Sequence, residues 1–101
     1  MKTGVELIAE ERQRQIEVEG WVPEHDDGHQ NGQLANAAGC YALSPENRHY
    51  DYGRNTPYAW PWNIVYWKPS PNRKSDLIKA GALIAAELDR LNRLEFQQPK
   101  T

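Results

Sequence analysis

Cysteine is almost absent from this sequence of 101 residues, which contains only Cys40. A single cysteine cannot form an internal disulfide, which favours a reducing, cytosolic environment. Long apolar runs are missing as well, since none approaches the roughly 20 residues of a membrane-spanning helix. Three glutamates within the first eleven residues argue against a secretory signal or a transit peptide. We therefore expect a cytoplasmic protein without a membrane partner.

The sequence also has little excess charge and few apolar residues. Its 12 Lys and Arg against 14 Asp and Glu give a net charge of -2, whereas proteins that bind duplex nucleic acid carry a concentrated basic surface. We therefore expect no duplex nucleic acid as a partner. Apolar residues make up 39% and the mean hydropathy is -0.88, which predicts a thin core and a homo-oligomer. The length supports one domain over residues 1–96, with a frayed tail at 97–101.

Aromatic residues and prolines are concentrated in one stretch. Seven of the ten aromatic residues lie between positions 50 and 67, and five of the seven prolines lie in or beside that stretch. Proline at this density excludes a helix and interrupts any strand. We predict a long loop over residues 45–74 that either packs over the helices or forms a ligand or partner surface.

Three helices are expected around this loop, at about 3–19, 27–43 and 75–94, which gives an all-α, three-helix bundle-like fold. Thr3 and Glu6 form a capping box for the first helix. Asp27 starts the second helix, whose small apolar face contains Leu34, Ala37, Ala38 and Tyr41.

The third helix carries the most regular apolar pattern. Its apolar positions alternate at spacings of four and three, as in a coiled-coil seam: Leu77, Gly81, Ile84, Leu88 and Leu91. We expect this seam to be buried against partners. Asp76 is a suitable N-cap for this helix, and Glu87 is an acid in mid-helix at the edge of the seam, which favours a functional role.

A first candidate site is the cluster His25, Asp26, Asp27 and His29. Imidazole and carboxylate groups are the usual ligands of zinc and other transition metals. The alternatives are an acidic helix cap with polar neighbours, or direct catalysis by one of the histidines.

A second candidate site combines Trp60, Trp62 and Trp67 with Lys68 and Arg73. Indole faces stack on nucleobases, and cations at a helix N-terminus favour a phosphate. With Glu87 on the following helix, these residues predict binding of a nucleotide-like small molecule that needs no cofactor. The alternative is that the rings supply the core. Cys40 is expected to be a buried structural thiol.

Several motifs occur in order along most of the chain: Glu11-Arg12-Gln13-Arg14-Gln15, Glu19-Gly20-Trp21, Glu24-His25-Asp26-Asp27, Trp60-Pro61-Trp62, Trp67-Lys68-Pro69 and Asp76-Leu77-Ile78-Lys79-Ala80-Gly81-Ala82-Leu83. Together they resemble a family of small uncharacterised proteins of bacteriophages and prophages. The resemblance implies a viral gene product made in the cytoplasm of a bacterial host, and it carries over no activity.

The helical layout is also similar to the all-α, MazG-like nucleoside triphosphate pyrophosphohydrolases, in which paired acids on two helices hold Mg²⁺. Two positions depart from that pattern. Arg14 stands where the third acid of the first motif is required, and Glu87 is followed by Asp89 and Arg90.

Three functions therefore stay open, and with them the question of whether the protein is an enzyme. The first is capture of a phosphorylated, nucleotide-like ligand, in the manner of a viral sponge for a nucleotide immune signal. The second is a MazG-like hydrolase with Mg²⁺, Mn²⁺ or Zn²⁺ held by His25, Asp26, Asp27, His29 and Glu87. The third is an inhibitor that docks its Trp-rich loop on a host protein.

Overall fold

The computed structural model describes residues 1–97 and is mostly α-helical. Its elements are four α-helices, two 3-10 turns and one hairpin made of two strands of two residues each. In chain order they are α1 (Gly4–Glu17), α2 (Pro23–Asp26), α3 (Gln33–Ala42), η1 (Pro45–Asn47), β1 (Tyr50–Asp51), β2 (Thr56–Pro57), η2 (Ile64–Tyr66) and α4 (Arg73–Gln97). The mostly helical fold class is therefore confirmed. The predicted tail, residues 97–101, lies outside the described residues except for Gln97, which ends α4.

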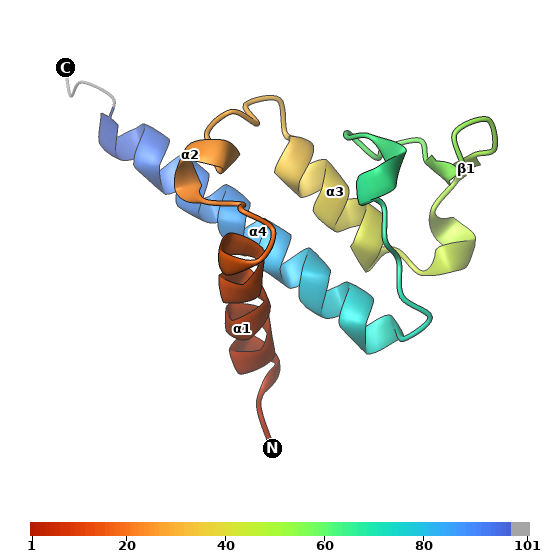
Figure 1. Ribbon diagram of the computed structural model, residues 1–101, viewed down its shortest axis with the longest axis horizontal. Coiled ribbons are helices and arrows are strands. Elements are labelled where there is room, and N and C mark those ends of the chain that lie inside the picture. The colour runs from red at the N-terminus through yellow and green to blue at the C-terminus, as the bar shows by residue number, and fades with distance from the viewer. Residues whose placement is uncertain (98–101) are drawn as a thin grey trace.

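Helix α4 is the central element of the molecule (Figure 1). Helix α3 lies antiparallel to its N-terminal half, α1 crosses it near the middle, and the short α2 packs on its C-terminal half. The molecule measures 47 × 38 × 23 Å. A thickness of 23 Å is close to two helix diameters, so the fold has only two layers.

The capping box of α1 is confirmed. Thr3 Oγ1 accepts a hydrogen bond from the Glu6 backbone N–H at 3.2 Å, and Glu6 Oε1 accepts one from the Thr3 N–H at 3.0 Å. After α1, Gly20 adopts a φ of +75°, which favours glycine and lets the chain turn toward α2.

The predicted start of the second helix is wrong. A separate helix, α2, begins at Pro23, because proline fits the first helical position, and α3 begins only at Gln33. Asp27 does not cap α3 because it is the C-cap residue of α2 and lies five positions before Gly32, the N-cap of α3, and its carboxylate instead pairs with Arg93 at 2.7 Å. The predicted apolar face of α3 is confirmed, since Leu34, Ala37, Ala38 and Tyr41 are buried. Cys40 is buried as expected, and burial raises the pKa of its thiol.

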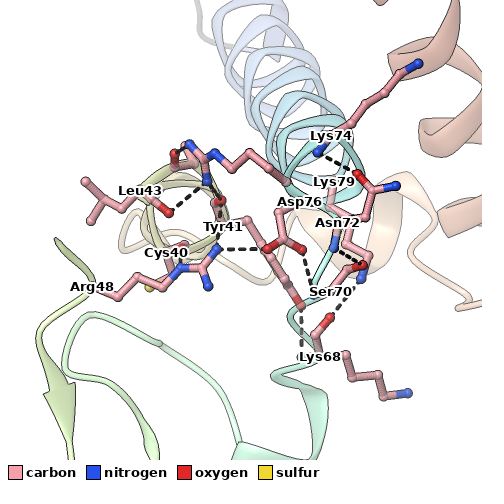
Figure 2. A network of polar contacts seen from close by, with 12 residues as sticks. Cys40, Tyr41, Leu43, Arg48, Lys68, Ser70, Asn72, Lys74, Asp76 and Lys79 are labelled. Carbon is pink, nitrogen blue, oxygen red and sulfur yellow. Dashed lines mark hydrogen bonds and ion pairs between the residues drawn. The ribbon is translucent and has the colours of Figure 1, made fainter. Parts of the chain in front are cut away.

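The N-cap prediction for Asp76 is also wrong. Helix α4 begins at Arg73, and the Asn72 side chain before it accepts a hydrogen bond from the Lys74 N–H at 2.9 Å. Asp76 instead lies in the interior, where its carboxylate accepts from Arg48 Nη2 at 2.9 Å and from the Ser70 N–H at 2.8 Å (Figure 2).

The core lies between α3 and the adjoining face of α4, and it is filled largely by alanine. Trp60, with 2% of its surface exposed, supplies the largest side chain in it. The face of α4 that packs inward contains Asp76, Ala80, Ala82, Leu83, Ala86 and Arg90. The seam predicted to be buried is therefore not part of the core, because Leu77, Ile84, Leu88 and Leu91 are 42–56% exposed.

Within residues 1–97, no helix combines the length and the apolar character that crossing a membrane requires.

Candidate functional site

An aromatic pocket of about 370 Å³ opens between the α1–α2 connection and the loop that follows Trp60. It is lined by Glu19, Trp21, His25, His29, Trp62, Asn63 and Tyr66. Its residues come from two segments that are more than 30 positions apart in the sequence. A volume of this size falls within the range of small-molecule sites in proteins.

The aromatic rings of the pocket form a continuous wall. The centroid of the Trp62 ring lies 5.1 Å from that of His29 and 5.9 Å from that of Trp21, and the two histidine rings are 4.8 Å apart. On its inner side, Trp62 packs edge-on against the core residue Trp60 at 5.4 Å. The buried core therefore holds the wall in place.

Polar atoms of this wall lack partners. Within residues 1–97, His29 Nε2 and Trp62 Nε1 are buried and make no hydrogen bond. Burial lowers the pKa of His29, and the nearby His25 acts in the same direction. His29 is therefore neutral near pH 7. Buried polar groups usually have partners, so unpaired nitrogens in the wall of a cavity indicate a place where a bound molecule or water completes the bonding.

Two ion pairs fix α2 under the pocket. Arg12 of α1 donates from Nη2 to Asp26 Oδ2 at 2.9 Å and from Nη1 to the Trp21 carbonyl at 3.2 Å. Arg93 of α4 donates to Asp27 Oδ1 at 2.7 Å. Burial raises the pKa of Asp26, against the opposing effect of Arg12.

These ion pairs separate the residues that were predicted as metal ligands. Asp26 Oδ2 is paired with Arg12 and Asp27 with Arg93, and the other oxygen of Asp26, Oδ1, lies 3.8 Å from Nδ1 of His25, whose ring adjoins that of His29. In the part of the chain that the structure describes, no group of three or more His, Cys, Asp or Glu side chains is placed to hold a metal ion. The predicted metal site is therefore not assembled in this arrangement.

A cationic cleft continues from the aromatic pocket along α1 and α4. A narrow cavity shares Glu19, Trp21 and Tyr66 with the pocket and reaches Lys68 and Lys79. Beyond it, an open depression of about 410 Å³ is lined by both lysines, by Arg14 and by the two acids that pair with Arg14, Glu11 and Glu19. We use the name cationic cleft for the surface of Arg14, Lys68 and Lys79.

The three cations of this cleft differ in how strongly they are engaged. Arg14 is paired with Glu11 and Glu19, at 2.7 and 3.1 Å. Lys79 Nζ donates to the Lys68 carbonyl at 2.8 Å and lies 5.4 Å from the centre of the Tyr41 ring. The Lys68 ammonium has no ion pair or hydrogen bond among residues 1–97 and is free to meet an anion.

The predicted receptacle of tryptophans and Arg73 is not brought together. Trp60 is in the core, and Trp67 donates from its indole N–H to the Tyr50 hydroxyl at 3.0 Å, with the Arg48 guanidinium 5.2 Å from its ring centre. The Arg73 guanidinium bonds to the Tyr41 carbonyl at the end of α3 at 3.2 Å and to the carbonyl of the next residue after the helix, Leu43, at 2.9 Å. The alternative role of the rings, as core, therefore applies to Trp60.

Glu87 is also used within the fold, because it pairs with Arg90 at 2.6 Å. Of the predicted ligand-binding residues, only Trp62 and Lys68 line the cavities described above, and they lie in different parts of the combined cleft. Sequence reasoning missed Trp21, Tyr66 and Lys79.

Comparison of the chain with protein-family models, curated proteins and solved structures finds no match. The resemblances to bacteriophage proteins and to MazG-like enzymes therefore stay predictions, and the site is interpreted from its geometry alone.

Proposed function

We propose that this protein binds a nucleotide-like, phosphorylated small molecule, with the flat group in the aromatic pocket and the phosphate in the cationic cleft. The observation that carries the proposal is the junction of the two cavities, where Glu19, Trp21 and Tyr66 belong to both. A ligand that is flat at one end and anionic at the other fits this combination.

The aromatic pocket supports the first half of the proposal. Stacking of a base on an aromatic side chain contributes about 1–3 kcal/mol, and Trp21 and Trp62 offer two indoles whose centroids are 5.9 Å apart. Glu19 supplies acceptors, while Asn63 supplies an amide donor for the edge of a base, since its Oδ1 already accepts from the Val65 N–H at 3.0 Å. Neutral His29 adds a further polar group without adding charge.

The cationic cleft supports the second half. Lys68 is the one of its three cations without a competing acid or carbonyl among the described residues. Lys79 approaches the same region from α4, and Arg14 adds a guanidinium that is partly neutralised by Glu11 and Glu19. A lysine binds phosphate as a point charge and does not require the bidentate geometry of arginine.

In the viral setting that the sequence motifs indicate, we propose that binding sequesters a nucleotide immune signal of the host. Sequestration requires affinity and no turnover. It therefore does not depend on the metal ion and the third acid that a MazG-like enzyme requires.

The proposal is tested by calorimetric titration of the purified protein with nucleoside triphosphates, cyclic dinucleotides and ADP-ribose derivatives. We expect at least one member of this panel to bind with a micromolar dissociation constant. Lys68→Ala should weaken that ligand about tenfold while leaving the matching unphosphorylated nucleoside unaffected, because only the phosphate contact is lost. Trp62→Ala should weaken both ligands, by tenfold or more.

Two matched controls accompany these variants. Lys2→Ala removes an exposed lysine that pairs with Glu10 on α1, and Tyr52→Ala removes an aromatic ring that is 90% exposed on the hairpin. Neither should change the affinity. Binding no tighter than millimolar across the whole panel would reject the proposal. Release of pyrophosphate or phosphate when Mg²⁺, Mn²⁺ or Zn²⁺ is added would favour the hydrolase instead.

A specific observation favours the protein-interaction alternative as a second candidate. The loop exposes a run of three neighbouring large side chains in η2, since Ile64, Val65 and Tyr66 are 48–63% exposed, whereas Trp60 is buried. If no ligand binds, η2 is the surface with which a host protein would be contacted.

A further inference from the structure

An apolar stripe on α4 has no partner within the described residues. It consists of Leu77, Ile84, Leu88 and Leu91, which expose 42–56% of their surface, and we call it the α4 seam. Successive residues on a helix differ by about 100° in direction. The seam therefore points away from Lys79 and Leu83, which face the ligand cavities.

The fold explains why the rest of the chain does not cover the seam. Ile8 of α1 packs against Gly81, on one side of the seam, and α3 covers Ala80 and Leu83 on the other side. Helix α4 has 25 residues and α3 has 10, so α4 is longer by about 22 Å at 1.5 Å per residue. Its C-terminal turns extend past α3 (Figure 1).

We infer that the α4 seam binds the α4 seam of a second copy of this chain, antiparallel and about a two-fold axis. Alternating spacings of three and four residues are the pattern of a helix that packs along another helix. A two-fold interface requires one surface that is complementary to itself. The seam meets this requirement because both copies would present the same row of aliphatic side chains.

The charges at the two ends of the seam favour the antiparallel direction. Lys74 lies one turn before Leu77, and Glu95 lies one turn after Leu91 at the other end. Neither side chain forms an ion pair within residues 1–97. An antiparallel pair places Lys74 near Glu95 of the second copy, whereas a parallel pair places like charges together. Antiparallel helix dipoles add to this preference.

A register follows from the spacing. If Ile84 packs on Leu88 of the second copy, then Leu77 lies opposite Glu95 of that copy, one turn from Lys74. Eight half-exposed aliphatic side chains, four from each copy, form a small interface of the size that transient complexes bury. We therefore expect a dissociation constant in the micromolar range.

The inference goes beyond the proposed ligand binding and does not depend on it, because the two surfaces lie on different faces of α4. The first test is sedimentation equilibrium of the full chain over a range of concentrations. The wild type should form dimers, and Ile84→Lys and Leu88→Lys should each weaken dimerisation about 100-fold because they place a charge in the centre of the seam. Both side chains are half exposed, so the variants should fold, and a circular dichroism spectrum of each variant checks this.

Val65→Lys is the matched control, because it introduces the same charge at an apolar residue that is 63% exposed on η2. It should dimerise like the wild type. A wild type that stays monomeric at near-millimolar concentration, or a Leu88→Lys variant that dimerises as strongly as the wild type, would overturn the inference.

The direction of the helices is tested by reversing charges. Lys74→Glu and Glu95→Lys should each weaken the dimer severalfold, and the double variant should recover it, because the antiparallel pair is restored with its charges exchanged. Strengthening by a single reversal, or no recovery in the double variant, would overturn the antiparallel arrangement.

Discussion

Arg48 and Asp76 show, at the scale of single residues, how the loop is fixed to the helices. Both are buried, with 5% and 1% of their surface exposed, and Arg48 also donates from Nε to the Cys40 carbonyl at 2.8 Å. Removing one partner of a buried ion pair leaves an uncompensated charge in the interior. We therefore expect Asp76→Asn to lower the free energy of unfolding by about 3–5 kcal/mol, measured by urea denaturation.

An exposed ion pair of the same molecule provides the comparison. Glu10 pairs with Lys2, and both side chains are more than half exposed. Glu10→Gln should cost less than about 1 kcal/mol, because exposed pairs are screened by solvent. If both variants lose the same stability, the buried pair does not anchor the loop.

His29 gives the fold a pH dependence. Its pKa lies below the ordinary value of 6.5, chiefly because of burial. Between that lowered pKa and 6.5, the unfolded chain binds a proton at this residue that the folded chain does not bind. The contribution of His29 to the free energy of unfolding is therefore complete above pH 6.5. It is lost as the pH falls through this window.

Urea denaturation at a series of pH values from 7.5 downward, roughly to pH 5, measures this effect. We expect His29→Gln to lose part of the slope that the wild type shows. Comparing the two proteins cancels the contribution of Asp26, which acts in the opposite direction because its pKa is raised. His49→Asn is the control, since His49 is exposed and Asn tolerates its φ of 49°. An identical slope in the wild type and His29→Gln would contradict the prediction.

Among the helices, the contact of α1 with α4 depends on a glycine. A Cβ added at Gly81 would lie 2.7 Å from Cγ1 of Ile8, which is too close for two carbon atoms. Gly81→Ala should therefore destabilise the fold by about 1–3 kcal/mol through overpacking, less up to about 1 kcal/mol from the better helix propensity of alanine. Thermal denaturation monitored by circular dichroism measures the difference.

In a variant that already lacks the Ile8 side chain, the stability change caused by Gly81→Ala should have the opposite sign. In Ile8→Ala, the obstructing side chain is absent and only the helix propensity remains. There Gly81→Ala should stabilise the protein by up to about 1 kcal/mol. Destabilisation of equal size in both backgrounds would show that Ile8 is not the reason for the glycine.

The helices were predicted from the sequence where local chemistry decides them. Thr3 and Glu6 cap α1 through residues three positions apart, and the buried face of α3 follows from its own periodicity. The start of α3 was missed because the helix begins after Gly32, which has no side chain that could form a cap. The sequence therefore carries no capping signal at this position.

The inward face of α4 was missed for a different reason. Apolar residues recur at helical spacing on two faces of this helix. One face carries leucines and an isoleucine, and the other carries alanines and Leu83. Hydrophobicity favours the first, but the chain buries the second because small residues let α3 approach closely. In the site, Trp62 and Lys68 were predicted from composition, whereas their companions Trp21, Tyr66 and Lys79 are gathered only by the tertiary fold.

For the whole molecule, the two-layer construction determines where interactions are available. A thickness of 23 Å leaves room for only one core layer, so α4 has its apolar seam on one side and the ligand cavities on another. Binding of a small molecule and pairing of two copies would therefore use one helix without competing for the same side chains.

The loop between α3 and α4 begins and ends at the same point of the fold. Arg48 at its entry and Arg73 at its exit both donate to the carbonyl of Tyr41, in the last turn of α3. The segment between them is thus a loop whose two ends are held close together by their bonds to α3. Changes in length at the exposed tip near Tyr52 would cost little, since the entropy of closing a loop grows slowly with its size. That tip is the natural place to attach a fluorophore or an epitope without disturbing the helices.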